Sequence, residues 1–140
     1  MPRTWSFRIH AVLAVLLLSA CDNPVDPMTS VAGDYRATTF SASFGSTPVN
    51  LLAAGVELEI NLRANGTTTG RFFVPAELND DDGAYTADLQ GSWTLNGNTV
   101  KFNHSADTLI RDMEFQVEGN RLVAEEVFGG GSVRVVLEKP

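Results

Sequence analysis

The sequence predicts an all-β fold, an antiparallel up-and-down β-barrel of about eight strands with one short helical turn near residues 49–54. Three observations lead to this prediction. Apolar and polar residues alternate over residues 56–63, which is the period of a strand with one buried face. Turn sequences rich in Asn and Gly recur roughly every 8 to 12 residues, as in barrels and sandwiches. No long stretch has the periodicity of an amphipathic helix.

The strands follow from the turns that separate them. Asn65-Gly66 is the strongest hairpin sequence, because both central residues of a type I′ turn need a positive φ. Further turns are expected at residues 96–98, 118–120 and 129–131. The strands are expected near residues 33–41, 56–64, 67–74, 84–90, 91–95, 98–104, 111–118 and 121–138. Residues 84–95 form either one bent strand or two; if they form one, the glycines at 129–131 divide the last segment and keep the count at eight.

The helical turn is expected in PVNLLAAG, residues 48–55, where Gly55 stands at the position of a C-terminal cap. The order of these pieces is GDYRATTF (33–40), this turn, consecutive hairpins, and GSW (91–93) midway. That order resembles the small lipocalin-like domains of bacterial lipoproteins over most of residues 33–140. Lipocalins carry Gly-x-Trp in the first strand, where this chain reads Gly-Asp-Tyr. The resemblance implies a closed barrel, and an eight-stranded barrel is either filled by side chains or holds one small ligand.

The N-terminus has the proportions of a secretory signal. Arg3 and Arg8 precede an apolar run at residues 9–18, which is too short to span a bilayer and is followed by small residues. LSAC, residues 18–21, resembles the lipobox of bacterial lipoproteins, in which the signal is cut before the cysteine and its sulfur is lipidated. Two or more acyl chains give a stable anchor. The resemblance implies a signal peptide over 1–20 and lipidation at Cys21, the only cysteine in the chain.

Composition limits the remaining functions. Residues 21–31 are expected to form the lipidated cysteine and a flexible, extended tether, and residues 32–140 the barrel domain. Cleavage would remove two of the ten basic residues and none of the 17 acidic ones, so the mature chain is more acidic than the net charge of −7. An acidic domain argues against nucleic acid as a partner, because phosphate binding needs clustered Lys and Arg. The expected location is the cell envelope, anchored to a membrane and facing the periplasm or the exterior. Asp22 after the cysteine favours the inner membrane weakly.

Motifs for catalysis and metal binding are weak. His104, Ser105 and Asp107 are close in sequence, but neighbours on one strand point to opposite faces, so we interpret them as a polar strand end. NDDDG, residues 79–83, lacks the alternate ligand spacing and final Glu of an EF-hand and is more typical of a solvated turn. No phosphate-binding loop and no Cys/His cluster is present in the sequence. We therefore expect no enzyme activity, no metal site and no cofactor.

Large apolar residues recur on successive hairpins, and alternation directs many of them to the inside. The candidate cavity-lining residues are Leu58, Ile60, Leu62, Phe72, Trp93, Phe102 and Phe115. The same residue types serve a filled core and the wall of a cup. The leading hypothesis is a lipid-anchored envelope protein whose barrel binds a small apolar or amphipathic ligand. The alternative is a protein-interaction module with a filled barrel, such as an inhibitor of an exported protease or an envelope assembly factor.

Overall fold

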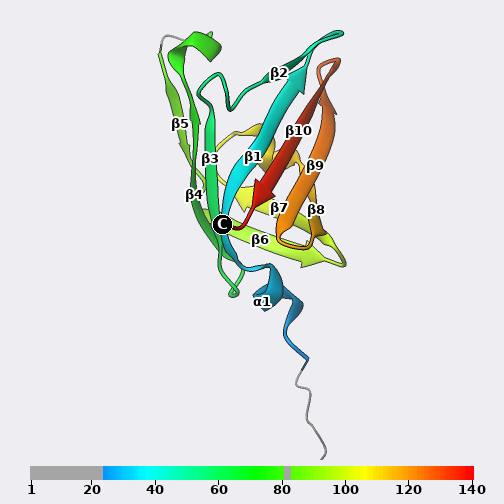
Figure 1. Cartoon of the computed structure of the whole chain (residues 1–140). Coiled ribbons are helices and arrows are strands. Elements are labelled where there is room, and N and C mark those ends of the chain that lie inside the picture. Colours follow the sequence, from blue (N-terminus) through cyan, green and yellow to red (C-terminus); the bar gives the residue numbers. More distant parts are fainter. Residues whose placement is uncertain (1–23, 81–82) are drawn as a thin grey trace, which may run out of the picture.

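The computed structural model describes residues 24–80 and 83–140, and in it the chain forms one closed antiparallel barrel (Figure 1). The predicted fold class is confirmed. Eight strands make the barrel in up-and-down order, and the pairing of the last strand with the first closes it. They are β1 (Gly33–Ser43), β3 (Glu57–Leu62), β4 (Thr67–Val74), β6 (Gly91–Asn96), β7 (Thr99–His104), β8 (Glu114–Glu118), β9 (Arg121–Phe128) and β10 (Gly131–Glu138).

Two short strands extend the barrel wall, and three short helices lie in the connections. β2 (Pro48–Asn50) pairs with the end of β1, and β5 (Tyr85–Asp88) pairs with β4. The helices are α1 (Pro27–Val31), the 3-10 turn η1 (Ala76–Leu78) and α2 (Leu109–Asp112). Among the described residues, none of these helices has the length and apolar character needed to cross a bilayer.

The segment around residues 84–96 forms two strands that share β4 as a neighbour. β5 pairs with β4 from Arg71 to Val74, whereas β6 pairs with β4 only at Thr67 and Thr68. Gly70 lies between the residues of β4 that pair with β6 and those that pair with β5, and a Cβ atom there would lie 2.4 Å from the Glu59 carbonyl oxygen. A side chain has no room at this position, which explains a glycine in the interior of a strand.

The up-and-down order places alternate connections at opposite ends of the barrel. One end holds α1 and the tight turns at 63–66, 97–98 and 119–120, and we call it the closed end. The other end holds the longer connections 43–56, 75–90 and 105–113 and the turn at 129–130, and we call it the mouth. Figure 1 shows α1 below the barrel and the tips of β2 and of the β9–β10 hairpin above it. The 11 residues of β1 join the two ends, a distance of about 36 Å at the usual rise per residue.

Two segments differ in detail from the sequence-based prediction. Residues 51–55 form hydrogen-bonded turns, including an i to i+4 bond from the Ala54 amide to the Asn50 carbonyl, and β2 precedes them. The prediction that the tether is extended is wrong for the residues of α1. Asp26 caps this helix by accepting a bond from the Met28 amide (2.9 Å), Pro27 begins it, and Val31 at its end is buried in the core. Cys21 lies outside the described residues.

Candidate functional site

The seven candidate cavity-lining residues all face the barrel interior. Leu58, Ile60 and Leu62 come from β3, and the four aromatic residues come from β4, β6, β7 and β8. Each exposes between 0 and 6% of its surface. The rings of Phe102 and Phe115 lie 5.2 Å apart between centroids. These side chains pack against one another and are not accessible from solvent. A molecule in solution therefore contacts other, more exposed residues first.

At the closed end, hydrogen bonds hold α1 against the barrel. The Tyr35 hydroxyl donates to the Val31 carbonyl at 2.6 Å, and burial raises the pKa of Tyr35 to about 12. Lys139, which follows β10, donates from Nζ to the Ser30 carbonyl at 2.8 Å. Trp93 Nε1 donates to the Arg63 carbonyl at 2.8 Å, so the indole lies beneath the β3–β4 turn. The candidate Trp93 is therefore at the end of the barrel that is farthest from the mouth.

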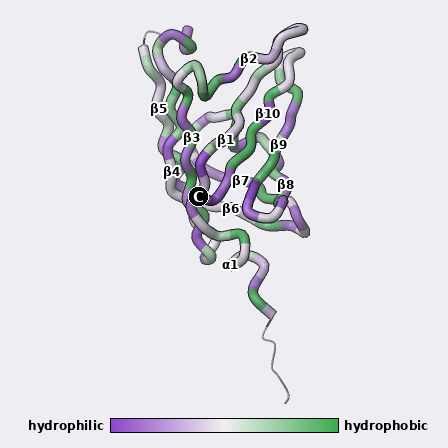
Figure 2. Tube along the Cα trace, viewed as in Figure 1, coloured by the Kyte–Doolittle hydropathy of each residue, from purple (hydrophilic) through white to green (hydrophobic). Residues whose placement is uncertain are grey.

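The mouth carries apolar side chains that the sequence analysis did not select. Phe44 and Val49 are 69% and 51% exposed, and Leu78 and Tyr85 also reach solvent. Four further apolar residues of this end are half-buried and pack against the core. We define the apolar rim as Phe44, Val49, Leu51, Leu52, Val74, Leu78, Tyr85 and Phe128. Figure 2 shows hydrophobic segments among the connections at this end.

A glutamate shares the inner face with this rim. Glu126 of β9 lies directly opposite Val133 of β10, Val133 lies opposite Ala42 of β1, and Ala42 lies opposite Val49 of β2. Directly opposed residues point to the same face of a sheet, and Val133 and Ala42 are buried in the core. Glu126 is therefore a half-buried carboxylate on the inner wall near the mouth.

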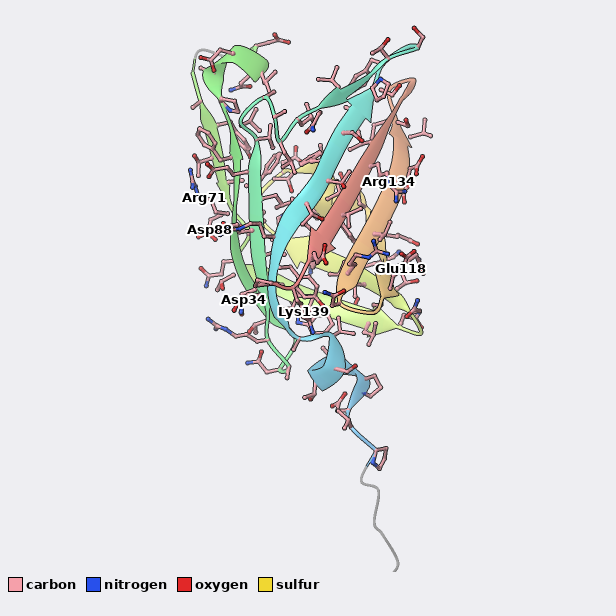
Figure 3. The ribbon with its side chains drawn as sticks, viewed as in Figure 1. Asp34, Arg71, Asp88, Glu118, Arg134 and Lys139 are labelled. Atoms are coloured by element: carbon pink, nitrogen blue, oxygen red, sulfur yellow. The ribbon has the colours of Figure 1, made fainter. Side chains whose placement is uncertain are left out.

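The outer wall carries a belt of alternating charge. Seven directly opposed positions on seven neighbouring strands alternate in sign, and we call them the charge belt: Glu118, Arg121, Glu138, Arg36, Glu59, Arg71 and Asp88. Arg36 and Glu59 form an ion pair at 2.6 Å, and Arg121 and Glu118 form one at 3.3 Å. In Figure 3, Arg71 and Asp88 lie at the left of the barrel and Glu118 lies at its right. Exposed pairs of this kind contribute about 0–1 kcal/mol each.

A shallow groove of about 760 Å³ lies over the same wall beside the C-terminus. Its polar lining residues are largely paired with one another. Asn61 Nδ2 donates to Asp34 at 2.7 Å, and Arg71 pairs with Glu57 at 3.1 Å. The groove therefore has the character of a solvated, self-satisfied barrel wall, and the rim at the mouth is the better candidate for binding.

His104 is buried but does not join the neighbours that the sequence placed beside it. Its Nε2 atom is 2.8 Å from the Thr108 hydroxyl, whereas Asp107 pairs with Arg111 at 2.5 Å. Nδ1 is buried without a hydrogen-bond partner in the described part of the structure. Burial and then the charge of Arg111 lower the pKa of His104, so the ring is neutral at pH 7.

The loop at residues 79–83 lies only partly within the described residues. Asn79 Nδ2 donates to the Gly83 carbonyl at 2.8 Å and closes the loop, and Asp81 and Asp82 lie outside the description. Within residues 24–80 and 83–140, no group of three or more His, Cys, Asp or Glu side chains is placed to hold a metal ion.

The chain is a small β-barrel protein with exposed apolar side chains at one end. No protein-family model, curated protein or solved structure matches this chain. The case for a function therefore depends on the residues themselves.

Proposed function

We propose that this protein is a lipid-anchored protein of the cell envelope that binds a small amphipathic molecule at the mouth of its barrel. The observation that supports binding at the mouth is a contrast in exposure. The seven candidate side chains that face the barrel interior expose at most 6% of their surface, whereas Phe44 and Val49 expose 69% and 51%. Covering such side chains stabilises a complex by about 25 cal/mol for each Å² of apolar surface removed from water.

The place where the chain enters the barrel determines how an anchor at Cys21 would orient the protein. The chain enters the barrel through α1 at the closed end, and residues 24–26 before it are exposed. A lipid anchor at Cys21 would hold the closed end toward the membrane. The mouth would then face away from it, about one barrel length from the lipid surface, where a molecule in the aqueous phase can reach it.

The proposal is tested by titrating the full chain carrying Cys21→Ser with a neutral probe, decyl maltoside, below its micellar concentration. Isothermal titration calorimetry is expected to show saturable binding with one site per chain. Phe44→Ala removes rim surface and should weaken binding about tenfold. Val127→Ala is the matched control, because Val127 is equally apolar and 76% exposed but faces outward.

With Trp5→Phe added, Trp93 is the only tryptophan in the chain, and its emission reports where the probe binds. A molecule bound at the mouth leaves the emission of Trp93 unchanged, because the indole is at the closed end. A saturable change in its emission would instead indicate entry into the barrel interior. Absence of saturable binding would contradict the proposal.

A second candidate, a protein-interaction module, is favoured by one further observation. Val127 stands on the outside of the β9–β10 hairpin, beyond the reach of a molecule at the inner face, and extends the apolar surface of the tip. A protein surface could cover Val127 and Phe44 together. In the titration above, the absence of binding by decyl maltoside would favour this second candidate over the first.

A further inference from the structure

We infer that Glu126 makes the mouth selective for amphipathic molecules with a cationic head group. This inference rests on the proposed function and names the class of ligand. It starts from the position of Glu126, whose inward-facing neighbours along β9 are Ala124 and Phe128. Ala124 belongs to the buried core and Phe128 to the apolar rim. The carboxylate therefore lies at the boundary between the rim and the filled interior.

The protein supplies no cation to this carboxylate in the described residues. The adjacent Glu125 faces outward and pairs with Arg134 at 3.1 Å, so Arg134 is directed away from the inner face. Arg111 is the only basic residue in the connections at the mouth, and it pairs with Asp107 and Asp112. No ion pair of Glu126 is present among the described residues. The basic residues nearest to it along the chain, Arg121 and Arg134, pair instead with Glu118 and Glu125.

Glu126 faces the same side of the sheet as apolar side chains, and opposite charges brought together at a binding surface give a complex its specificity. A ligand whose ammonium group reaches Glu126 would pair with this carboxylate while its chain covers rim residues such as Phe44 and Val49. The row from Glu126 through Val133 and Ala42 to Val49 crosses four adjacent strands, which lie about 4.8 Å apart. Its span of about 14 Å suits a linear molecule with one charged end.

Other acidic residues at the mouth also favour a cationic ligand. Glu77 and Asp80 are exposed on the connection between β4 and β5, Asp107 precedes α2, and Asp112 is the last residue of α2. The local field therefore attracts cations and repels anions, and added salt weakens the effect.

The test compares probes with the same decyl chain, namely decyltrimethylammonium, decyl maltoside and decyl sulfate. Each is titrated below its micellar concentration into the full chain carrying Cys21→Ser. We expect the cationic probe to bind about tenfold more tightly than the neutral one and the anionic probe to bind more weakly than both. Glu126→Gln keeps the size of the side chain and should remove the cationic preference, while decyl maltoside binds as before.

Glu125→Gln is the matched control, because it removes a charge from the adjacent position on the outer face. It should leave the preference intact. Equal binding of all three probes, or a preference that survives in Glu126→Gln, would overturn the role of Glu126 while leaving binding at the mouth in place. Failure of all three probes to bind would overturn the proposed function itself. Thermal unfolding of each variant establishes that the barrel is folded.

Discussion

Replacing Tyr35 by Phe should destabilise the folded protein near pH 8 and stabilise it near pH 12. The hydroxyl is buried and donates to the Val31 carbonyl at 2.6 Å, and a hydrogen bond of this kind contributes about 1 kcal/mol net. At pH 8 the variant should therefore be less stable than the parent by about 1 kcal/mol. Because the lost bond joins β1 to α1, the variant should also loosen the attachment of α1.

The sign changes above pH 10 because burial raises the pKa of Tyr35 to about 12. In the unfolded chain the phenol loses its proton near pH 10, whereas the folded chain holds it until about pH 12. The unfolded state then binds fewer protons, so the stability of the parent falls as the pH rises through this interval. A shift of two units corresponds to at most about 3 kcal/mol. Near pH 12 the variant should therefore be more stable than the parent by up to about 2 kcal/mol.

Urea unfolding between pH 8 and 12 measures this difference, followed by the emission of Trp93 in proteins that all carry Trp5→Phe. Tyr85→Phe is the control, since it removes a tyrosine hydroxyl from the mouth and leaves the contact with α1 untouched. Parallel stability curves for the parent and Tyr35→Phe across the whole range would refute the argument.

Three other predictions concern the core, the buried histidine and the anchor. Ile60→Ala should cost about 2–5 kcal/mol in denaturant unfolding, whereas Glu59→Ala on the opposite face should cost less than about 1 kcal/mol; equal losses would contradict the assigned faces of β3. Because burial lowers the pKa of His104, the unfolded chain takes up a proton as the pH falls below about 6.5, whereas the folded chain takes it up only at lower pH. Stability should fall over that interval, and His104→Gln should flatten the slope; an unchanged slope would assign the acid loss to other groups. Cys21→Ser should move the protein from the membrane fraction to the soluble fraction or leave the signal uncleaved, and normal membrane fractionation with normal cleavage would rule out the lipid anchor.

Most of the barrel could be predicted from local patterns, because its hairpins combine alternating strands with turn residues that are recognisable in the sequence. Alternation fixed the buried face of β3, and Asn65-Gly66 marked the turn that leads into β4. β2 could not be predicted in the same way. It has only three residues, all exposed, and it is a strand because β1 continues beside it and offers free backbone groups. Pairing between segments, more than local propensity, decides such an element.

The site was harder to predict because a filled interior and a ligand cup need the same residues. Apolar alternation identified Phe102 and Phe115 as inward-facing, which the structure bears out, but their exposure depends on how closely all eight strands approach. Phe44 and Val49 gave no signal of this kind. They lie within residues 43–50, where the other residues are small or polar, and only the fold places this segment at the mouth.

The outer wall also determines the chemistry of the mouth, through the register of β9. Side chains alternate along this strand, so the register that directs Arg121 and Glu125 outward directs Glu126 inward. Arg121 belongs to the charge belt and lies between Glu118 and Glu138, and a slip of one residue would remove it from between these two carboxylates. The same slip would turn Leu122 from the core to solvent and exchange the two adjacent glutamates. The belt adds to the hydrophobic preference for the observed register, because opposite charges across strands stabilise a pair and like charges destabilise it. Exposed ion pairs that contribute little individually thus help to determine which of two neighbouring carboxylates faces the proposed ligand.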